Sequence, residues 1–104
     1  MDFFNFIWDE DKEKLNRVKH GISFREAEQV FYDKYMLYDR DLKHSNDEER
    51  FKALGRSEKP RLLMVIHCIS DGLEVRIISA RKATKKEEEA YENERRIRFY
   101  NRSQ

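Results

Sequence analysis

The stretch RLLMVIHCISDGLEVRIISA, residues 61–80, decides the fold. Its first part, Arg61–Ile69, is an apolar run typical of a central strand covered on both faces. Ser70-Asp71-Gly72 has the composition of a hairpin turn, and Leu73–Ala80 is again rich in β-branched residues, which favours a strand that returns antiparallel. The stretch therefore predicts a β-hairpin at the centre of a sheet.

Two further strands are expected before this hairpin. Tyr35–Tyr38 and Arg50–Arg56 have strand-like composition, and the polar segment Asp39–Glu49 between them is expected to be an exposed loop. Phe3–Trp8 is rich in aromatic residues and short, so it fits either a first strand or an extended lead-in.

Two helices are expected near the N-terminus. Asp9 is a suitable N-cap for a helix that ends near His20, where Gly21 supplies a left-handed stop. Ser23 and Glu26 have the spacing of a capping box and open a second helix that extends to about residue 33. The short connection predicts that the two helices pack as a hairpin.

The last element is expected to be a polar helix. Thr84 and Glu87 form another capping-box pattern, and the helix is expected to run from Thr84 to about Tyr100 with a thin apolar face. Such a helix either lies lightly on the sheet or is covered by a partner, and the second alternative predicts a partner-binding face. The predicted fold is α+β, with two N-terminal helices, a four-stranded antiparallel sheet and a C-terminal helix.

Length and composition predict one domain, residues 1–104, because two would each be too small to bury a core. Residues 1–49 carry 13 acidic and 8 basic side chains, and residues 50–104 carry 8 acidic and 14 basic ones. The basic second half indicates an anionic partner, although solvated helices rich in Lys and Glu explain the counts equally well.

The sequence also predicts a location. The single Cys68 has no partner for an internal disulfide, which favours a reducing compartment and a buried thiol. The N-terminus has no signal-peptide pattern, and no apolar run approaches the roughly 20 residues that span a bilayer. A cytoplasmic protein without membrane contact is expected.

The candidate functional residues are mainly cationic. Arg76 and Arg81 are five residues apart, so a regular strand places them on opposite faces unless a bulge intervenes or Arg81 lies beyond the strand end. His67 fits either a hydrogen-bonded core residue or a catalytic group, and Glu49 either a structural ion pair or an acid–base group. Lys19 and His20 are mainly explained by the helix C-terminus. No cluster has metal-ligand spacing, so neither a metal nor a cofactor is expected.

Several segments together resemble the BrnT toxin family of bacterial type II toxin–antitoxin systems. The matching segments are Phe6–Asp9, Lys19–Ala27, Val30–Asp33, His44–Ser45, Glu48–Arg50, Leu54–Ser57 and Arg76–Ala83. The resemblance implies a RelE-like fold and a metal-free, RNA-cleaving toxin. It also implies neutralisation by a BrnA-like ribbon-helix-helix antitoxin, in a toxin–antitoxin heterotetramer that contacts operator DNA only through the antitoxin.

On this hypothesis the RNA 2′-hydroxyl attacks its own 3′-phosphate, which requires a base, an acid and stabilisation of the phosphorane charge. Arg56 and Arg81 are assigned to phosphate stabilisation, and Glu49 or His67 to proton transfer. Lys19, Arg50, Arg76 and Lys82 are expected to hold the RNA backbone. The alternative is a non-catalytic module that binds RNA or a protein.

Overall fold

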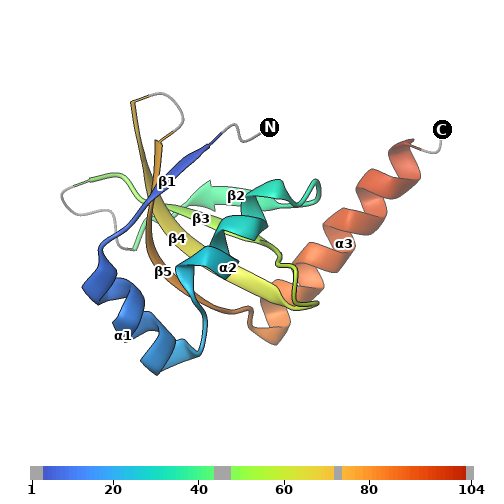
Figure 1. Cartoon of the computed structure of the whole chain (residues 1–104). Coiled ribbons are helices and arrows are strands. Elements are labelled where there is room, and N and C mark those ends of the chain that lie inside the picture. The colour runs from blue at the N-terminus through green and yellow to red at the C-terminus, as the bar shows by residue number, and fades with distance from the viewer. Residues whose placement is uncertain (1–3, 44–47, 72–73, 103–104) are drawn as a thin grey trace.

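A five-stranded sheet carries helices on both faces (Figure 1). The structure, a computed structural model, describes residues 4–43, 48–71 and 74–102. The strands are β1 (Asn5–Ile7), β2 (Leu37–Arg40), β3 (Phe51–Arg56), β4 (Leu62–Ser70) and β5 (Glu74–Lys82). Their order across the sheet is β1-β5-β4-β3-β2, so the predicted hairpin strands β4 and β5 lie inside the sheet.

The prediction of a four-stranded antiparallel sheet is wrong in one respect. β1 pairs with β5 in parallel, from Asn5 opposite Glu74 to Ile7 opposite Arg76, which makes the sheet mixed. The other neighbouring strands are antiparallel. Three residues are too few to show a period in the sequence, and this explains why the segment fitted a lead-in equally well.

The N-terminal helices are α1 (Glu10–His20) and α2 (Phe24–Glu28), and α2 continues as a 3-10 turn, η1 (Gln29–Tyr32). Asp9 caps α1 by accepting from two backbone N–H groups, and Gly21 ends it at φ 71°. The expected single helix up to residue 33 is thus a short α-helix followed by a tighter turn.

The capping box expected at α2 is half present. Ser23 Oγ accepts from the N–H of Glu26 at 3.1 Å. The Glu26 carboxylate instead accepts from Arg61 Nε and Nη2 at 2.8 and 2.6 Å and from Ser57 Oγ at 2.6 Å. This ion pair attaches α2 to the loop between β3 and β4, and it lowers the pKa of Glu26.

The main core lies between the sheet and α1, α2 and η1. Its members are buried side chains of the helical segment and of the inner strands: Ile22, Phe24, Ala27, Val30, Phe31, Ala53, Leu63, Val65, Val75, Ile77 and Ala80. Trp8 packs edge-on against Phe24 with ring centroids 6.0 Å apart, at the border of this core.

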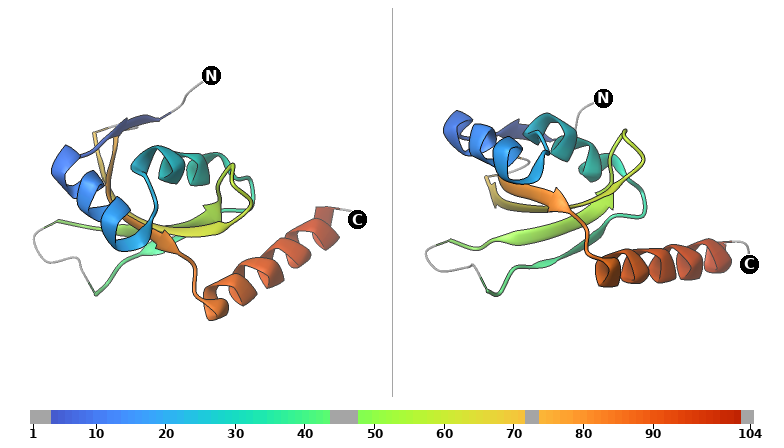
Figure 2. Two further views of the ribbon diagram at one scale, coloured as in Figure 1. Left: turned by 60° about the horizontal axis from the view of Figure 1, so that its bottom comes forward. Right: turned by 90° about the horizontal axis from the view of Figure 1, so that it is seen from below.

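The other face of the sheet is covered by α3 (Lys85–Arg102), and only at one end (Figure 2). Tyr91 is fully buried there, against Leu54, Leu62 and Met64. Its hydroxyl donates to Asp33 Oδ2 at 2.5 Å, which fixes the helix to the chain segment after η1. The C-terminal end of α3 extends past the sheet (Figure 2), and the part of this face away from the helix stays open.

The segment 39–49 was expected to be an exposed loop, and its first residues differ from that expectation. Asp39 and Arg40 belong to β2, and Asp41 is buried, with its N–H donating to the Arg50 carbonyl at 2.8 Å. His44, Ser45 and residues 72–73, which include Gly72 of the predicted turn, lie outside the described residues. Within the described ranges, no helix has the length and apolar character needed to cross a bilayer.

Candidate functional site

A β-bulge interrupts the pairing of β4 and β5. Ile66 lies opposite Ser79, whereas the next residue, His67, lies opposite Ile77. Ile78 is therefore an extra residue on β5 without a direct counterpart on β4. A bulge of this kind changes which face of the sheet the later residues of the strand occupy.

The bulge brings Arg76 and Arg81 to the same face. Arg76 lies opposite Cys68 and Arg81 opposite Met64, and residues directly opposite in an antiparallel pair share a face. Residues 64 and 68 are an even number apart on β4, so they also share a face. This is the alternative that the sequence left open, and it places both arginines on the α3 side of the sheet.

The part of this face that α3 leaves open forms a hollow of about 660 Å³, which we call the basic hollow. Its cationic lining residues are Arg40, Lys43, Arg50, Lys52 and Arg81; its acidic ones are Asp39, Asp41 and Glu87; the rest are His20, Leu42, Ile66, Ile78 and Ser79. Five Lys and Arg side chains against three carboxylates give the hollow an excess of positive charge. It suits an anionic ligand.

Arg81 is positioned at the wall of the basic hollow by the start of α3. Its Nη1 and Nη2 donate to Glu87 Oε1 and Oε2 at 2.9 and 3.0 Å. Glu87 also accepts from the N–H of Thr84 at 2.9 Å, and Thr84 Oγ1 accepts from the N–H of Glu87 at 3.2 Å, so the capping box predicted at this helix start is complete. The hydrogen bonds lower the pKa of Glu87 and raise that of Arg81.

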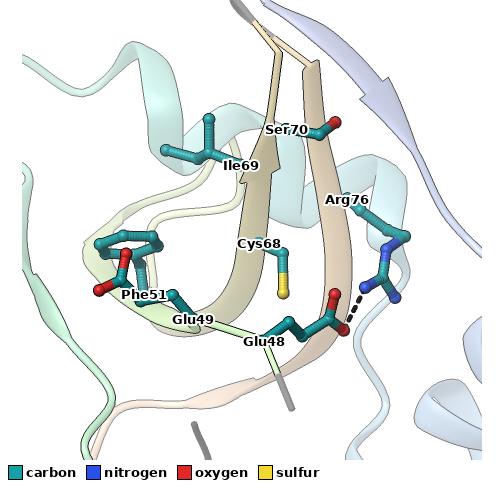
Figure 3. Close-up of a pocket in the computed structure, with 7 residues that line it drawn as sticks. All are labelled: Glu48, Glu49, Phe51, Cys68, Ile69, Ser70 and Arg76. Carbon is teal, nitrogen blue, oxygen red and sulfur yellow. Dashed lines mark hydrogen bonds and ion pairs between the residues drawn. The ribbon is translucent and has the colours of Figure 1, made fainter.

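Arg76 lies in a separate pocket of about 390 Å³. Figure 3 shows its guanidinium directed toward the Glu48 carboxylate, with which it forms an ion pair, and the Cys68 thiol beside them. Burial raises the pKa of that thiol, so Cys68 behaves as the buried apolar residue that the sequence favoured. Arg76 and Arg81 therefore share a face but not a pocket.

Glu49 lines the same pocket as Arg76 and is exposed (Figure 3). Its carboxylate forms an ion pair with Arg40, a residue of the basic hollow. This geometry matches the ion-pair interpretation of Glu49 and leaves its carboxylate outside the group that lines the basic hollow.

Arg56, predicted to stabilise the phosphate, lies at the far end of β3 under α3. Its Nη2 donates to Glu92 Oε1 at 2.9 Å, and its guanidinium carbon is 5.7 Å from the centre of the Tyr91 ring. It is not among the residues that line the basic hollow. The contacts indicate that Arg56 holds α3 against the sheet.

His67 is in the core, on the face opposite to Arg81. It is fully buried, its Nε2 lies 3.1 Å from the Tyr38 hydroxyl, and its ring contacts Phe31 with centroids 4.8 Å apart. Burial lowers the pKa of His67 to about 4, so the ring is neutral at physiological pH. The geometry gives RNA no access to His67, and the core interpretation is the one that the structure supports.

The two predicted lysines do not line the basic hollow. Lys19 is exposed in the last turn of α1, next to His20. Lys82 is exposed at the end of β5 and lies opposite Leu63, on the other face from Arg81. Of the eight residues proposed from the sequence, Arg50 and Arg81 are brought together in the basic hollow.

Eleven of the thirteen residues that line the basic hollow were missing from that prediction, among them His20, Lys52 and Glu87. Lys52 has a signal in the sequence, because it is two residues from Arg50 and shares its face in a strand. His20 and Glu87 were explained by helix ends, and the sequence does not show that those two helix ends meet at one hollow.

A family model described as "Ribonuclease toxin, BrnT, of type II toxin-antitoxin system" matches residues 8–87. No individual curated protein sequence matches the chain. Among solved structures, the crystal structure of the Brucella abortus ribonuclease toxin BrnT is similar, with a TM-score of 0.62 and 25% sequence identity. That likeness covers 79% of this chain and 99% of the Brucella chain. The chain belongs to the BrnT family of ribonuclease toxins of type II toxin–antitoxin systems.

Proposed function

We propose that the protein is an endoribonuclease that binds RNA across the basic hollow and cleaves it without a metal ion. A base removes the proton of a 2′-hydroxyl, and its oxygen attacks the adjacent 3′-phosphate. The P–O5′ bond breaks, the 5′ oxygen takes up a proton, and the products are a 2′,3′-cyclic phosphate and a 5′-hydroxyl.

The observation that carries this proposal is the position of Arg81, a guanidinium at the wall of an open, cationic hollow. A guanidinium donates two parallel hydrogen bonds to a phosphate, and such donors stabilise the charge that develops on a phosphorane. Lys52, in β3, and Arg50, the residue before β3, line the same hollow, where they suit the neighbouring phosphates.

In the proposed mechanism cationic side chains stabilise the developing charge, and no metal ion takes part. Among residues 4–43, 48–71 and 74–102, no group of three His, Cys, Asp or Glu side chains is placed to hold a metal ion.

Cleavage of RNA by the purified, antitoxin-free protein in EDTA tests the proposal. Incubation with naked RNA and with translating ribosomes, followed by mapping of new ends, is expected to give 5′-hydroxyl ends in at least one of the two. Arg81→Ala is expected to lower the cleavage rate by roughly 100-fold or more, whereas Arg25→Ala, an exposed arginine of α2 on the other side of the sheet, serves as the matched control. Unchanged cleavage by Arg81→Ala would remove Arg81 from the mechanism.

The same experiment separates the alternative function, a non-catalytic module that binds RNA or a protein. Both functions predict salt-sensitive RNA binding, because both use the cationic hollow. If the wild-type protein binds RNA but produces no new ends with or without ribosomes, the binding module is the better description.

Type II membership implies an antitoxin partner and an RNA target. We further propose that this antitoxin is a BrnA-like ribbon-helix-helix protein in a heterotetramer, that operator DNA is bound only through it, and that the complex is cytoplasmic. Co-expression with such an antitoxin and measurement of the complex mass tests the composition. A mass other than that of two toxins and two antitoxins contradicts it.

A further inference from the structure

His20 is the histidine of the described chain that lines the basic hollow. It is the last residue of α1, it is exposed, and Gly21 turns the chain away immediately after it. The same hollow is lined by Arg81 from β5, by Glu87 from α3 and by Arg50, the residue before β3. An imidazole and the guanidinium that is proposed to bind the reacting phosphate therefore line the same hollow.

The position of His20 is fixed by an anchor one turn earlier in α1. The amide of Asn16 donates from Nδ2 to the Ala80 carbonyl at 2.9 Å and accepts at Oδ1 from the Ala80 N–H at 3.1 Å. Nδ2 also donates to the Ile22 carbonyl at 2.8 Å. The Asn16 side chain is buried. β1 pairs with β5 only at residues 74–76, and further along β5 the Asn16 amide forms the two backbone hydrogen bonds that a neighbouring strand would form.

This anchor brings the end of α1 to the residue before Arg81. Residues four apart lie on the same side of a helix, so His20 follows Asn16 on the side that faces β5. Ala80, the partner of Asn16, directly precedes Arg81 in β5. Figure 2 shows α1 lying alongside this strand. Buried hydrogen bonds of Asn16 thus hold the end of α1, which carries His20, against the strand that carries Arg81.

We propose that His20 is a catalytic residue of the RNA cleavage described above, the group that takes the proton from the 2′-hydroxyl. The inference rests on that proposed function. The neutral imidazole accepts the proton, the 2′ oxygen forms a bond to phosphorus, and the 5′ oxygen leaves with the bonding electron pair and takes a proton from water. Imidazole suits this step because histidine changes its charge between about pH 5 and 8.

The rival explanation is electrostatic, since a positive charge is favourable in the last turn of a helix and near RNA. His20→Lys distinguishes the two, because lysine keeps a positive charge at this position but is a poor base near neutral pH. His20→Gln removes the charge and keeps a polar side chain. Lys14→Ala, an exposed change on α1 at a residue that does not line the basic hollow, is the matched control.

Single-turnover cleavage in EDTA is measured for these variants, with ribosomes if the wild type requires them. Affinity is measured separately on RNA with a 2′-deoxy residue at the mapped cleavage site, which binds but cannot react. We expect His20→Lys and His20→Gln to cleave roughly 100-fold or more slowly, with the affinity of His20→Lys within about threefold of wild type. The melting temperatures of all three variants are expected to match that of the wild type, since His20 and Lys14 are both exposed.

Cleavage by His20→Lys at the wild-type rate overturns the inference and leaves His20 as a positive charge. A loss of affinity as large as the loss of rate also overturns it, because His20 then acts in binding. Both results differ from failure of the proposed function itself, in which the wild-type protein produces no cleavage ends under any of these conditions.

Discussion

Arg81 and Glu87 are joined by two charge-assisted hydrogen bonds, 2.9 and 3.0 Å long, across the junction between β5 and α3. The same carboxylate closes the capping box of α3. The guanidinium that is best placed to bind a phosphate is thus already bound by a carboxylate that fits it in the same two-point manner. RNA must either displace Glu87 or bind the remaining donors of Arg81.

Replacing Glu87 with Gln is expected to tighten RNA binding by roughly fivefold, because it removes one negative charge from the basic hollow and releases Arg81. The Gln carbonyl oxygen still accepts from Thr84 N–H, so the helix cap is kept. Filter binding or fluorescence anisotropy at fixed salt measures the change.

Glu88→Gln is the matched control, since it makes the same charge change at the next residue, which is exposed and does not line the basic hollow. Equal affinity gains in both variants would mean that net charge, rather than release of Arg81, is responsible.

Most of the fold follows from local patterns in the sequence. The apolar run of β4, the turn and the β-branched run of β5 predict the central hairpin, and the caps at Asp9 and Thr84 place two helix starts correctly. Strand β1, which the sequence left open between a strand and a lead-in, is three residues long and is a strand because its backbone groups pair with β5, far along the sequence. Such tertiary pairing has no local signal.

The site was predicted less completely, because its geometry depends on one extra residue. Strand parity separates Arg76 from Arg81, and the bulge at Ile78 reverses that result. The role of His67 could not be decided from the sequence for a different reason. Its apolar neighbours favoured a core position but left a catalytic role open, and the packing against Phe31 and the hydrogen bond to Tyr38 place it in the core.

Lys52 is expected to hold RNA through one phosphate contact. Lys52→Ala should weaken RNA binding and reduce the magnitude of the salt slope, d log K/d log[salt], by about 0.7 to 1, because one fewer counterion is released. Titrations at four or more salt concentrations measure the slope. Lys12→Ala, an exposed lysine in the first turns of α1, is the control, and an equal change of slope in both variants would contradict a specific contact.

Burial of His67 predicts a pH-dependent stability. Its pKa is lowered from 6.5 to about 4 in the folded protein, so below about pH 6.5 the unfolded chain takes up a proton that the folded one does not. The free energy of unfolding is therefore expected to fall by roughly 3 kcal/mol as the pH falls from 6.5 to 4. Urea unfolding of wild type and His67→Gln at pH 7.5 and 4.5 measures this loss.

The glutamine variant does not titrate at this position, so its stability should change less over the same interval, even though it is less stable at pH 7.5. Carboxylates such as Glu26 contribute equally to both proteins. A parallel loss of stability in wild type and variant would show that His67 is protonated as easily in the folded state as in the unfolded one.

The projecting end of α3 is expected to bind the antitoxin. The family match ends at Glu87, and beyond it the helix carries Ile97, Phe99 and Tyr100 with 54%, 65% and 65% of their surfaces exposed. Arg95 lies over the Tyr35 ring at 5.4 Å, and these two residues form a small pocket with Arg96 and Phe99. Exposed aromatic residues among arginines fit an apolar, acidic segment of a partner protein.

Phe99→Ser combined with Tyr100→Ser should therefore weaken antitoxin binding by tenfold or more, since buried aromatic anchors contribute about 2 kcal/mol each at interfaces. The melting temperature should change little, because 65% of the surface of each residue is exposed in the free toxin. Calorimetric titration of the purified toxin with antitoxin measures the affinity, with Glu89→Ala at the exposed start of α3 as the control. Unchanged affinity in the double variant would place the antitoxin on another surface, and the basic hollow, where it would block RNA directly, becomes the next surface to test.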